Sequence, residues 1–213
     1  AITSKLVANL ITTAGTSRAI FVDLHANQIQ GYFDIPVDQL FAPPVQYEYF
    51  RGLPNLSEFV IVSPDTGGAE RDRYFAKLLD LDIAIIDKSR LPASVQKNVS
   101  EVMNVIGDIQ GKNLVIIDDL VDTGGTIVKA AAALKERGAR DIYVTCTHPV
   151  LSRDAVERIV KSEIKEFVTT DTIQLPERVA KSPKFKVLSL AGILAEAIRR
   201  THRASPMRQP LTA

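Results

Sequence analysis

Short apolar runs alternate with longer amphipathic segments along most of the chain. This alternation is typical of α/β folds, in which helices connect neighbouring strands of a largely parallel sheet. The pattern predicts strands at residues 18–23, 58–63, 82–87, 113–119, 141–148 and 184–190, and helices at residues 4–13, 68–80, 126–137, 152–162 and 191–202. We therefore expect an α/β fold with a mostly parallel sheet flanked by helices.

Four segments depart from this alternation. Residues 35–45 are rich in proline, which predicts a loop because proline cannot occupy a central strand. The apolar stretch at 103–109 and the strand at 113–119 flank "QGK", which favours a hairpin or a tight turn. Residues 89–102 are polar with weak periodicity, so they read as a long mobile loop. The tail from 203 onward contains two prolines and is expected to be disordered.

Composition and charge exclude several classes of function. The chain has 26 basic and 25 acidic residues, and a net charge of +1 gives no field that favours nucleic acid or a membrane surface. No apolar run is long enough to span a bilayer, and no signal-peptide pattern opens the chain. The single cysteine, Cys146, cannot form an internal disulfide and lies in a strand pattern, so we expect a core position. These observations favour a cytoplasmic protein.

Polar groups stand where four predicted strands end. They are Asp23, Asp65, Lys88 and the pair Asp118 and Asp119. Open α/β sheets bind ligands at the carboxyl edge of their strands, so these groups can meet in one crevice.

The segment "LVIIDDLVDTGGTIVKA", residues 114–130, combines carboxylates with a glycine turn. Gly124 and Gly125 allow a ligand to approach the backbone, and amide groups at the start of the following helix attract phosphate. The carboxylates of Asp118 and Asp119 can accept hydrogen bonds from sugar hydroxyls. A ligand that carries a phosphate group beside a diol is a ribose phosphate, so the segment suits that class of ligand. The alternative is an Asp-rich turn that only caps a helix, and the absent P-loop lysine excludes a Walker motif.

This segment resembles the ribose-phosphate-binding signature shared by type I phosphoribosyltransferases and phosphoribosyl pyrophosphate synthetases. The resemblance implies a type I phosphoribosyltransferase-like fold. By itself it does not choose between a transferase and a synthetase. The resemblance implies that eight residues contact ribose 5-phosphate. They are Arg90, Asp118, Asp119, Asp122, Thr123, Gly124, Gly125 and Thr126.

A second segment, "DLHANQIQGYFDIPVD" at residues 23–38, resembles the signature of ribose-phosphate pyrophosphokinases along its whole length. Asp23, His25, Asp34 and Asp38 are oxygen and imidazole groups of the kind that bind Mg²⁺ together with nucleotide phosphates. The resemblance implies that these four residues bind the metal ion and that His25 and Asp38 also bind ATP. Taken alone, His25 reads equally well as a hydrogen-bonded loop histidine.

A third segment, "VSPDTGGAERDR" at residues 62–73, places Asp65 after a strand and two glycines before a helix. Such a turn suits anions and metals. In the family that the chain resembles, the matching loop lies where pyrophosphate is built, and its aspartate serves a Mg²⁺. The resemblance therefore implies a pyrophosphate loop formed by Asp65, Thr66, Gly67 and Gly68. The alternative is that Asp65 or Thr66 simply caps the helix.

Lys88 and Arg90, in "DKSR", head the long polar loop. Phosphoryl-type transfer needs mobile positive charge to stabilise its transition state. The resemblance implies that both residues are catalytic and that Arg90 also binds the sugar substrate. A generic surface pair is the alternative. The loop that follows is a few residues longer than is usual in the family.

The resemblance as a whole implies a ribose-phosphate diphosphokinase, which transfers pyrophosphate from Mg·ATP to the 1-hydroxyl of ribose 5-phosphate and releases AMP. It also implies symmetric homo-oligomers, often hexamers, with phosphate and ADP as allosteric effectors. Residues 1–40 then correspond to a remnant of an N-terminal phosphoribosyltransferase-like domain that carries the metal and ATP motif. Residues 41–190 form a C-terminal domain that binds ribose 5-phosphate, and residues 191–213 a helix and flexible tail.

Two other functions stay open at this point. One is a type I phosphoribosyltransferase, in which the motif at residues 23–38 has no clear role. The other is a non-catalytic regulatory subunit of the synthetase. Family members carry an additional N-terminal portion, and this chain begins at Ala1 without a methionine, which indicates processing or a fragment.

Overall fold

The computed structural model describes residues 2–65, 67–88 and 103–203. The chain divides into two compact units, one formed by residues 1–44 and 189–213 and the other by residues 45–188. The predicted boundaries at 40 and 190 lie near this division. The C-terminal helix, which the sequence set apart with the tail, belongs to the unit of the N-terminal residues. No helix in the described ranges is long and apolar enough to cross a membrane.

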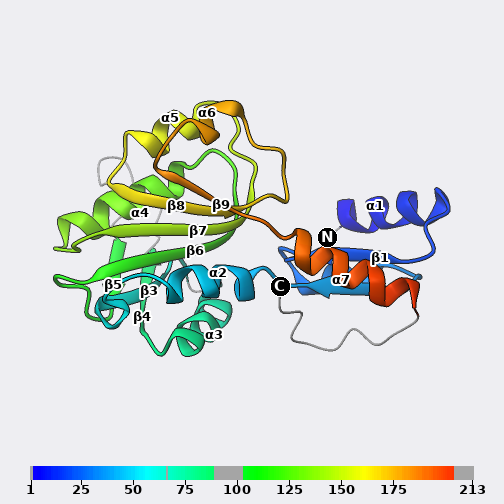
Figure 1. Cartoon of the computed structure of the whole chain (residues 1–213), viewed down its shortest axis with the longest axis horizontal. Helices are drawn as coiled ribbons and strands as arrows, with labels where there is room; N and C mark the ends of the chain where they lie inside the picture. The colour runs from blue at the N-terminus through cyan, green and yellow to red at the C-terminus, as the bar shows by residue number, and fades with distance from the viewer. Residues whose placement is uncertain (1, 66, 89–102, 204–213) are drawn as a thin grey trace, which may run out of the picture. The chain divides into compact units, whose positions relative to one another are not determined.

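The larger unit alternates strands and helices (Figure 1). Its elements are α2 (Pro43–Arg51, beginning at the boundary), β3 (Phe59–Ser63), α3 (Ala69–Leu79), β4 (Asp82–Lys88), β5 (Met103–Ile106), β6 (Asn113–Val121), α4 (Gly125–Glu136), β7 (Ile142–Pro149), α5 (Ala155–Val160), β8 (Ile164–Thr170), α6 (Glu177–Ala180) and β9 (Phe185–Leu188). The strands form one 7-stranded sheet in the order β5-β4-β3-β6-β7-β8-β9.

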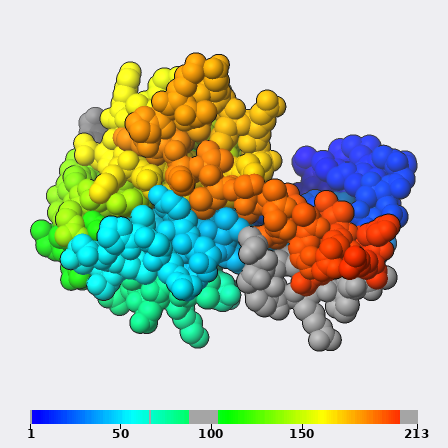
Figure 2. All heavy atoms as spheres, in the orientation of Figure 1, coloured from blue at the N-terminus to red at the C-terminus, as the bar shows by residue number. Residues whose placement is uncertain are grey.

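All neighbouring strands of this sheet run parallel except β5, which is antiparallel to β4. The expected α/β class, with a mostly parallel sheet between helices, is confirmed. Helices α4, α5 and α6 lie on one face and α2 and α3 on the other (Figure 1). In the space-filling view, α2 in cyan and α5 and α6 in yellow to orange cover much of the sheet (Figure 2).

The core of the larger unit has two halves, one on each face of the sheet. All five residues of β3 are buried, as expected of a central strand covered on both faces. The half of the core between the sheet and helices α4 and α5 contains Ile116, Leu134 and Cys146. The half between the sheet and helices α2 and α3 contains Phe50 and Phe75. The expectation that Cys146 is a core residue is confirmed, because its thiol is in no disulfide and its side chain is fully buried.

The predicted hairpin between residues 103–109 and 113–119 is wrong. β5 pairs with β4, in the register Ile85↔Ile106, and both β4 and β3 stand between β5 and β6. The tight turn is present, because Gly111 has a φ of 67°. Gly138, at a φ of 88°, ends the turn that follows α4, a position that favours glycine. The sequence analysis also missed β8 and α6.

The smaller unit contains α1 (Ile2–Thr13), β1 (Ala19–Val22), the 3-10 helix at Asn27–Tyr32, β2 (Val37–Leu40) and α7 (Ala191–His202). β1 and β2 form a parallel two-stranded sheet in the register Ala19↔Val37. The loop predicted at 35–45 is therefore wrong. Pro36 precedes β2 and Pro43 opens α2, so the prolines stand beside the elements and do not interrupt them. The loop predicted at 89–102 and the tail after 203 fall outside the described residues.

Candidate functional site

Three strand ends of the larger sheet bring candidate residues to one edge. β4, β3 and β6 are parallel neighbours, so their carboxyl ends point the same way. Asp65 follows β3, Lys88 is the last residue of β4, and Asp118 and Asp119 lie in the last part of β6. Asp23 follows a strand of the separate two-stranded sheet, so the fourth predicted group does not belong to this edge.

The glycine turn at residues 122–126 connects β6 directly to α4. Gly124 has a φ of 70°, a left-handed conformation that costs little only for glycine, and it immediately precedes the helix. The first amide groups of a helix have no acceptor within the helix and carry partial positive charge. The turn and the start of α4 therefore form a local structure suited to a phosphate, as the sequence predicted.

The neighbouring carboxylates occupy a partly buried position. Asp119 is only 8% exposed, and its amide nitrogen donates a hydrogen bond of 2.9 Å to Asp118 Oδ1. The pKa of Asp118 is raised to about 7, chiefly by burial and also by the Asp119 carboxyl, against the opposing effect of Arg71. Near neutral pH, Asp118 therefore exchanges between its neutral and its ionised form, and the ionised form is the better acceptor for sugar hydroxyls.

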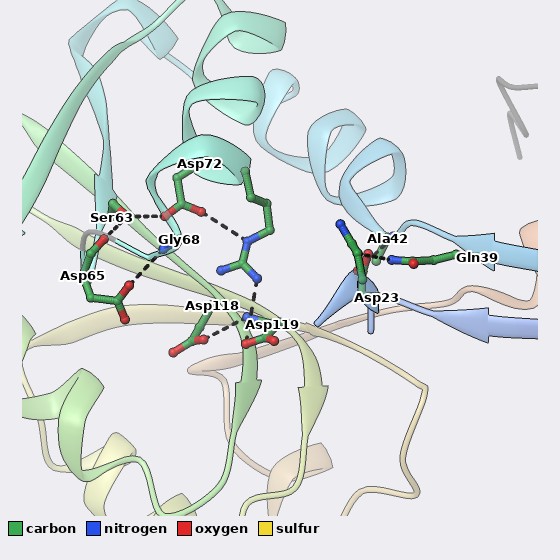
Figure 3. Close-up of polar contacts among 11 residues, drawn as sticks. Asp23, Gln39, Ala42, Ser63, Asp65, Gly68, Asp72, Asp118 and Asp119 are labelled. Carbon is green, nitrogen blue, oxygen red and sulfur yellow. Dashed lines mark hydrogen bonds and ion pairs between the residues drawn. The ribbon is translucent and has the colours of Figure 1, made fainter. Parts of the chain in front are cut away.

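The turn after β3 is held by two hydrogen bonds (Figure 3). The Gly68 amide donates to Asp65 Oδ1 at 2.9 Å, and Ser63 Oγ donates to the Asp65 carbonyl at 2.7 Å. The Asp65 side chain is otherwise exposed. Asp65 does not cap the helix, because Gly68 is the N-cap residue of α3 and no side chain in the described part of the chain caps it. Asp65 closes the turn before α3 with one carboxylate oxygen, which is compatible with a ligand at the other.

Two residues of α3 join this site, and the sequence analysis did not single them out. Asp72 is fully buried, and Ser63 Oγ lies 2.5 Å from its Oδ2 (Figure 3). Arg71 Nε lies 3.4 Å from Asp72 Oδ1, and Arg71 Nη1 lies 3.8 Å from Asp119 Oδ1. Burial raises the pKa of Asp72 to about 6, against the opposing effects of Ser63 and Arg71. Arg71 therefore connects the turn after β3 to the carboxylates of β6.

A signal for Asp72 is present in the sequence. α3 buries Phe75, Ala76 and Leu79, and position 72 lies on the same helical face. A carboxylate on an apolar face needs partners, and this is the kind of departure that marks a functional region.

The smaller unit carries the motif at residues 23–38. Asp23 has a φ of 42°, and its Oδ2 accepts a hydrogen bond of 3.1 Å from the Ala42 amide (Figure 3). Arg18 Nε donates to Asp38 Oδ2 at 2.6 Å. The exposed Asp34 lies 3.5 Å from Lys5 Nζ. His25 is exposed.

No group of three or more His, Cys, Asp or Glu side chains suited to a metal ion occurs among residues 2–65, 67–88 and 103–203. Asp23 and Asp38 instead help to hold the smaller unit together. Magnesium keeps several of its waters and needs few protein ligands, so a site with one or two carboxylates would not form such a group. The metal and ATP roles of His25, Asp23, Asp34 and Asp38 stay a prediction.

The predicted catalytic residues Lys88 and Arg90 lie at and beyond the end of a described range. The backbone of Lys88 ends β4 at the site edge. Its side chain, Arg90 and Thr66 lie outside the described residues, so their predicted roles stay predictions. His148 is a structural histidine, since its Nδ1 lies 3.1 Å from Thr172 Oγ1.

Comparison with known proteins gives a consistent set of relatives. The family described as the phosphoribosyl synthetase-associated domain matches residues 87–211. A ribose-phosphate pyrophosphokinase of Bacillus subtilis is 56% identical over 201 residues, and one of Staphylococcus saprophyticus is 53% identical over 203. Among solved structures, phosphoribosylpyrophosphate synthetase from Mycobacterium smegmatis superposes with a TM-score of 0.87 at 36% identity, over 96% of this chain.

These matches cover almost all of this chain but only part of the relatives. Both curated relatives align with 94% of this chain, and the chain spans 62% of their length. The corresponding share of the Mycobacterium smegmatis chain is 65%. The resemblance inferred from the motifs at residues 23–38 and 114–130 is confirmed. The chain belongs to the family of ribose-phosphate pyrophosphokinases, the phosphoribosyl pyrophosphate synthetases.

Proposed function

We propose that the protein containing this chain is a ribose-phosphate diphosphokinase. It transfers the pyrophosphoryl group of ATP to the 1-hydroxyl of ribose 5-phosphate, giving phosphoribosyl pyrophosphate and AMP for nucleotide biosynthesis. The O1 oxygen attacks the β-phosphorus, the bond from that phosphorus to the oxygen shared with the α-phosphate breaks, and the hydroxyl proton is lost. The chain supplies the part of the enzyme that holds the sugar phosphate.

One observation carries this proposal: the strand–turn–helix of β6 and α4 joins two acceptors for a diol to a turn for a phosphate. Asp118 and Asp119 precede the turn, and Gly124 opens the helix at a φ of 70°. The proposed contacts to the 5-phosphate come from residues 122–126. The carboxylates of Asp118 and Asp119 accept hydrogen bonds from the ribose hydroxyls.

The turn after β3 lies at the neighbouring strand end and is the proposed site where pyrophosphate is assembled. Its residues are Asp65, Thr66, Gly67 and Gly68. The parallel pairing of β3 with β6 supports this role, because it sets the two turns on adjacent strand ends. Lys88 is the last residue of β4, and in this proposal Lys88 and Arg90 supply positive charge to the transferring group.

The carboxylates of this edge suit Mg²⁺, which prefers oxygen ligands. Asp65 is exposed, and its Oδ1 is the oxygen that accepts from Gly68. We assign Asp65 to a Mg²⁺ ion and, separately, the residues of the 23–38 motif, His25 first, to a metal and ATP site. When bound with the nucleotide, Mg²⁺ neutralises charge on the phosphates.

The proposed partners follow from the same function. They are ATP and ribose 5-phosphate as substrates, further copies of the protein in a symmetric oligomer, often a hexamer, and phosphate and ADP as effectors. A cytoplasmic location fits a nucleotide-forming enzyme.

The direct test is AMP formation. The chain is incubated with ribose 5-phosphate and Mg·ATP, with ribose replacing ribose 5-phosphate as the control. AMP that requires the 5-phosphate supports the proposal and excludes a regulatory subunit without activity. If no AMP forms, the assay is repeated with a protein of the relatives' full length. Continued absence of AMP with Lys88 intact contradicts the proposal.

A further inference from the structure

We propose that Arg158 is a positioning residue for the phosphate-binding turn, which it holds in shape through the carbonyl of Thr123. The inference rests on the proposed role of residues 122–126 in binding the 5-phosphate. Arg158 belongs to α5, thirty-five residues beyond Thr123 in the chain, and no motif of the sequence marks it.

The guanidinium of Arg158 links two groups. Its Nη1 donates to the Thr123 carbonyl at 3.2 Å. Its Nη2 donates to both carboxylate oxygens of Asp154, at 2.9 and 2.8 Å. The Arg158 guanidinium lowers the pKa of Asp154. The Asp154 carboxylate thus fixes one end of a planar, rigid group, and the other end reaches the turn.

The bond to the carbonyl also sets the direction of an amide. In a trans peptide the carbonyl oxygen and the following N–H point to opposite sides. Because the Thr123 carbonyl points at Arg158, the Gly124 N–H points away from it. The Gly124 N–H is one of the amide groups on which phosphate binding at a helix start depends. Loss of Arg158 would free this peptide to rotate.

Gly125 supports the same arrangement from a second direction. A Cβ atom placed on Gly125 would lie 3.2 Å from Arg158 Nη1, closer than most such contacts. A methyl group at position 125 would therefore press on the guanidinium, which would have to shift to make room for it. The second glycine of the turn and Arg158 fit one another.

Backbone contacts place the segment before α5 against the strand that precedes the turn. The Leu151 amide donates to the Val121 carbonyl at 3.1 Å, and the Ser152 amide donates to the Asp122 carbonyl at 3.0 Å. Arg158 extends this series by one residue, to Thr123. The turn is thus supported at three successive carbonyls by one segment of the chain.

The test compares Arg158→Met with Arg178→Met in the whole 213-residue chain. Arg178 is a matched control: it also bonds to this region, through Glu157 Oε1 and the Arg153 carbonyl, each at 3.1 Å. Ribose 5-phosphate binding is measured by calorimetry, and folding by thermal melting. We expect Arg158→Met to weaken binding by about tenfold or more, since a charged hydrogen bond is lost. Arg158→Lys should restore part of it, and Arg178→Met should bind like the parent chain.

A readout without ligand separates this inference from the proposed function. Amide hydrogen exchange in the first turn of α4, where the Val128 amide donates to the Gly124 carbonyl at 3.0 Å, should be faster in Arg158→Met and unchanged in Arg178→Met. If the parent chain does not bind ribose 5-phosphate, the proposed role of residues 122–126 in phosphate binding fails for this chain, and the exchange rates alone decide the role of Arg158. Unchanged exchange in a folded Arg158→Met chain overturns the inference.

A double substitution tests the contact with Gly125. Gly125→Ala should speed exchange in the turn, because the new methyl group displaces the guanidinium. Adding Gly125→Ala to Arg158→Ala should change exchange much less than it does in the parent chain, since the clash has gone. If the effects of the two substitutions on amide exchange are fully additive, the contact assigned between Arg158 and Gly125 is wrong.

Discussion

The hydroxyl oxygen of Ser63 lies 2.5 Å from a carboxylate oxygen of Asp72 that is closed off from solvent. Ser63 Oγ is also 2.7 Å from the Asp65 carbonyl, yet a hydroxyl has one hydrogen to donate. When Asp72 is protonated it can donate to Ser63, which then donates to Asp65, and both contacts are satisfied. When Asp72 is ionised, the two acceptors compete for one hydrogen. The protonation of a buried acid is thus linked to the turn after β3.

Asp72→Asn should alter how stability depends on pH. The pKa of Asp72 is raised from 3.8 to about 6 in the folded protein, so folding favours its protonated form. The folded protein therefore loses stability as pH rises from about 4 to about 6, by roughly 2–3 kcal/mol in all. Asparagine cannot ionise and removes this loss. We expect the variant to be at least as stable as the parent at pH 7.5, by urea unfolding at several pH values.

Asp82→Asn is the matched control, because Asp82 is an exposed aspartate of β4. Its stability profile should follow that of the parent. If Asp72→Asn and the parent lose stability equally between pH 4 and pH 6, Asp72 does not titrate as described.

The affinity for ribose 5-phosphate should rise with pH around neutrality. The pKa of Asp118 is raised to about 7, chiefly by burial, and sugar hydroxyls donate best to the ionised form. We expect binding to be up to about tenfold weaker at pH 6 than at pH 8. The substrate phosphate also titrates in this range, so Asp118→Asn serves as the reference. The variant should retain only the dependence due to phosphate.

Arg71→Met gives a second check on the same carboxylate. Arg71 lowers the pKa of Asp118, so its removal should move the midpoint of the binding profile to higher pH. A profile of Asp118→Asn that matches the parent, or a midpoint unmoved in Arg71→Met, would contradict the assignment. Calorimetric titrations from pH 5.5 to pH 8.5, in buffers of equal ionic strength, are the measurement.

Much of the fold could be predicted because its signals are local. β3 and β6 are short apolar runs, α3 and α4 follow the helical period, and glycine or aspartate turns bound these elements. β8 was missed because Lys165 and Glu166 interrupt its apolar run. The pairing of β5 with β4 was missed for a different reason: strand neighbours far apart in the chain are decided by packing and not by local pattern.

The candidate site divides in the same way. The turns at Asp65 and Gly124 could be predicted because glycine and aspartate chemistry is contained within a few residues. Arg71 acts on Asp119 across the sheet edge, and Arg158 acts on Thr123 from another helix. Arginines are common in helices of any role, so only the folded structure distinguishes these two.

Lys184 should be important for stability. Its Nζ donates to the carbonyls of Ile159, Val160 and Ser162 at 3.2, 2.8 and 2.9 Å, and so caps the end of α5. Lys184→Met removes the donor for three carbonyls at once, and we expect a loss of roughly 1–3 kcal/mol in the free energy of unfolding.

Lys181→Met is the control for Lys184. Lys181 is 72% exposed and pairs with Glu177 one helical turn away, an interaction worth about 0.5 kcal/mol or less. Urea unfolding followed by circular dichroism compares the two variants. Equal losses would show that the capping bonds contribute little.

Lys88→Ala should reduce turnover far more than sugar binding. Lys88 ends β4 at the edge that carries the Asp65 turn and the β6 carboxylates. A positive charge that acts on the transferring phosphoryl group stabilises the transition state more than the ground state, so its loss lowers kcat and leaves KM for the sugar nearly unchanged. By analogy with other transition-state donors, we expect kcat to fall by about a hundredfold or more.

AMP release by the active protein is measured over a range of ribose 5-phosphate concentrations. Lys129→Ala, on the exposed side of α4, is the control for loss of a lysine. A kcat equal to that of the control would remove Lys88 from the mechanism, whereas a raised KM alone would make it a binding residue.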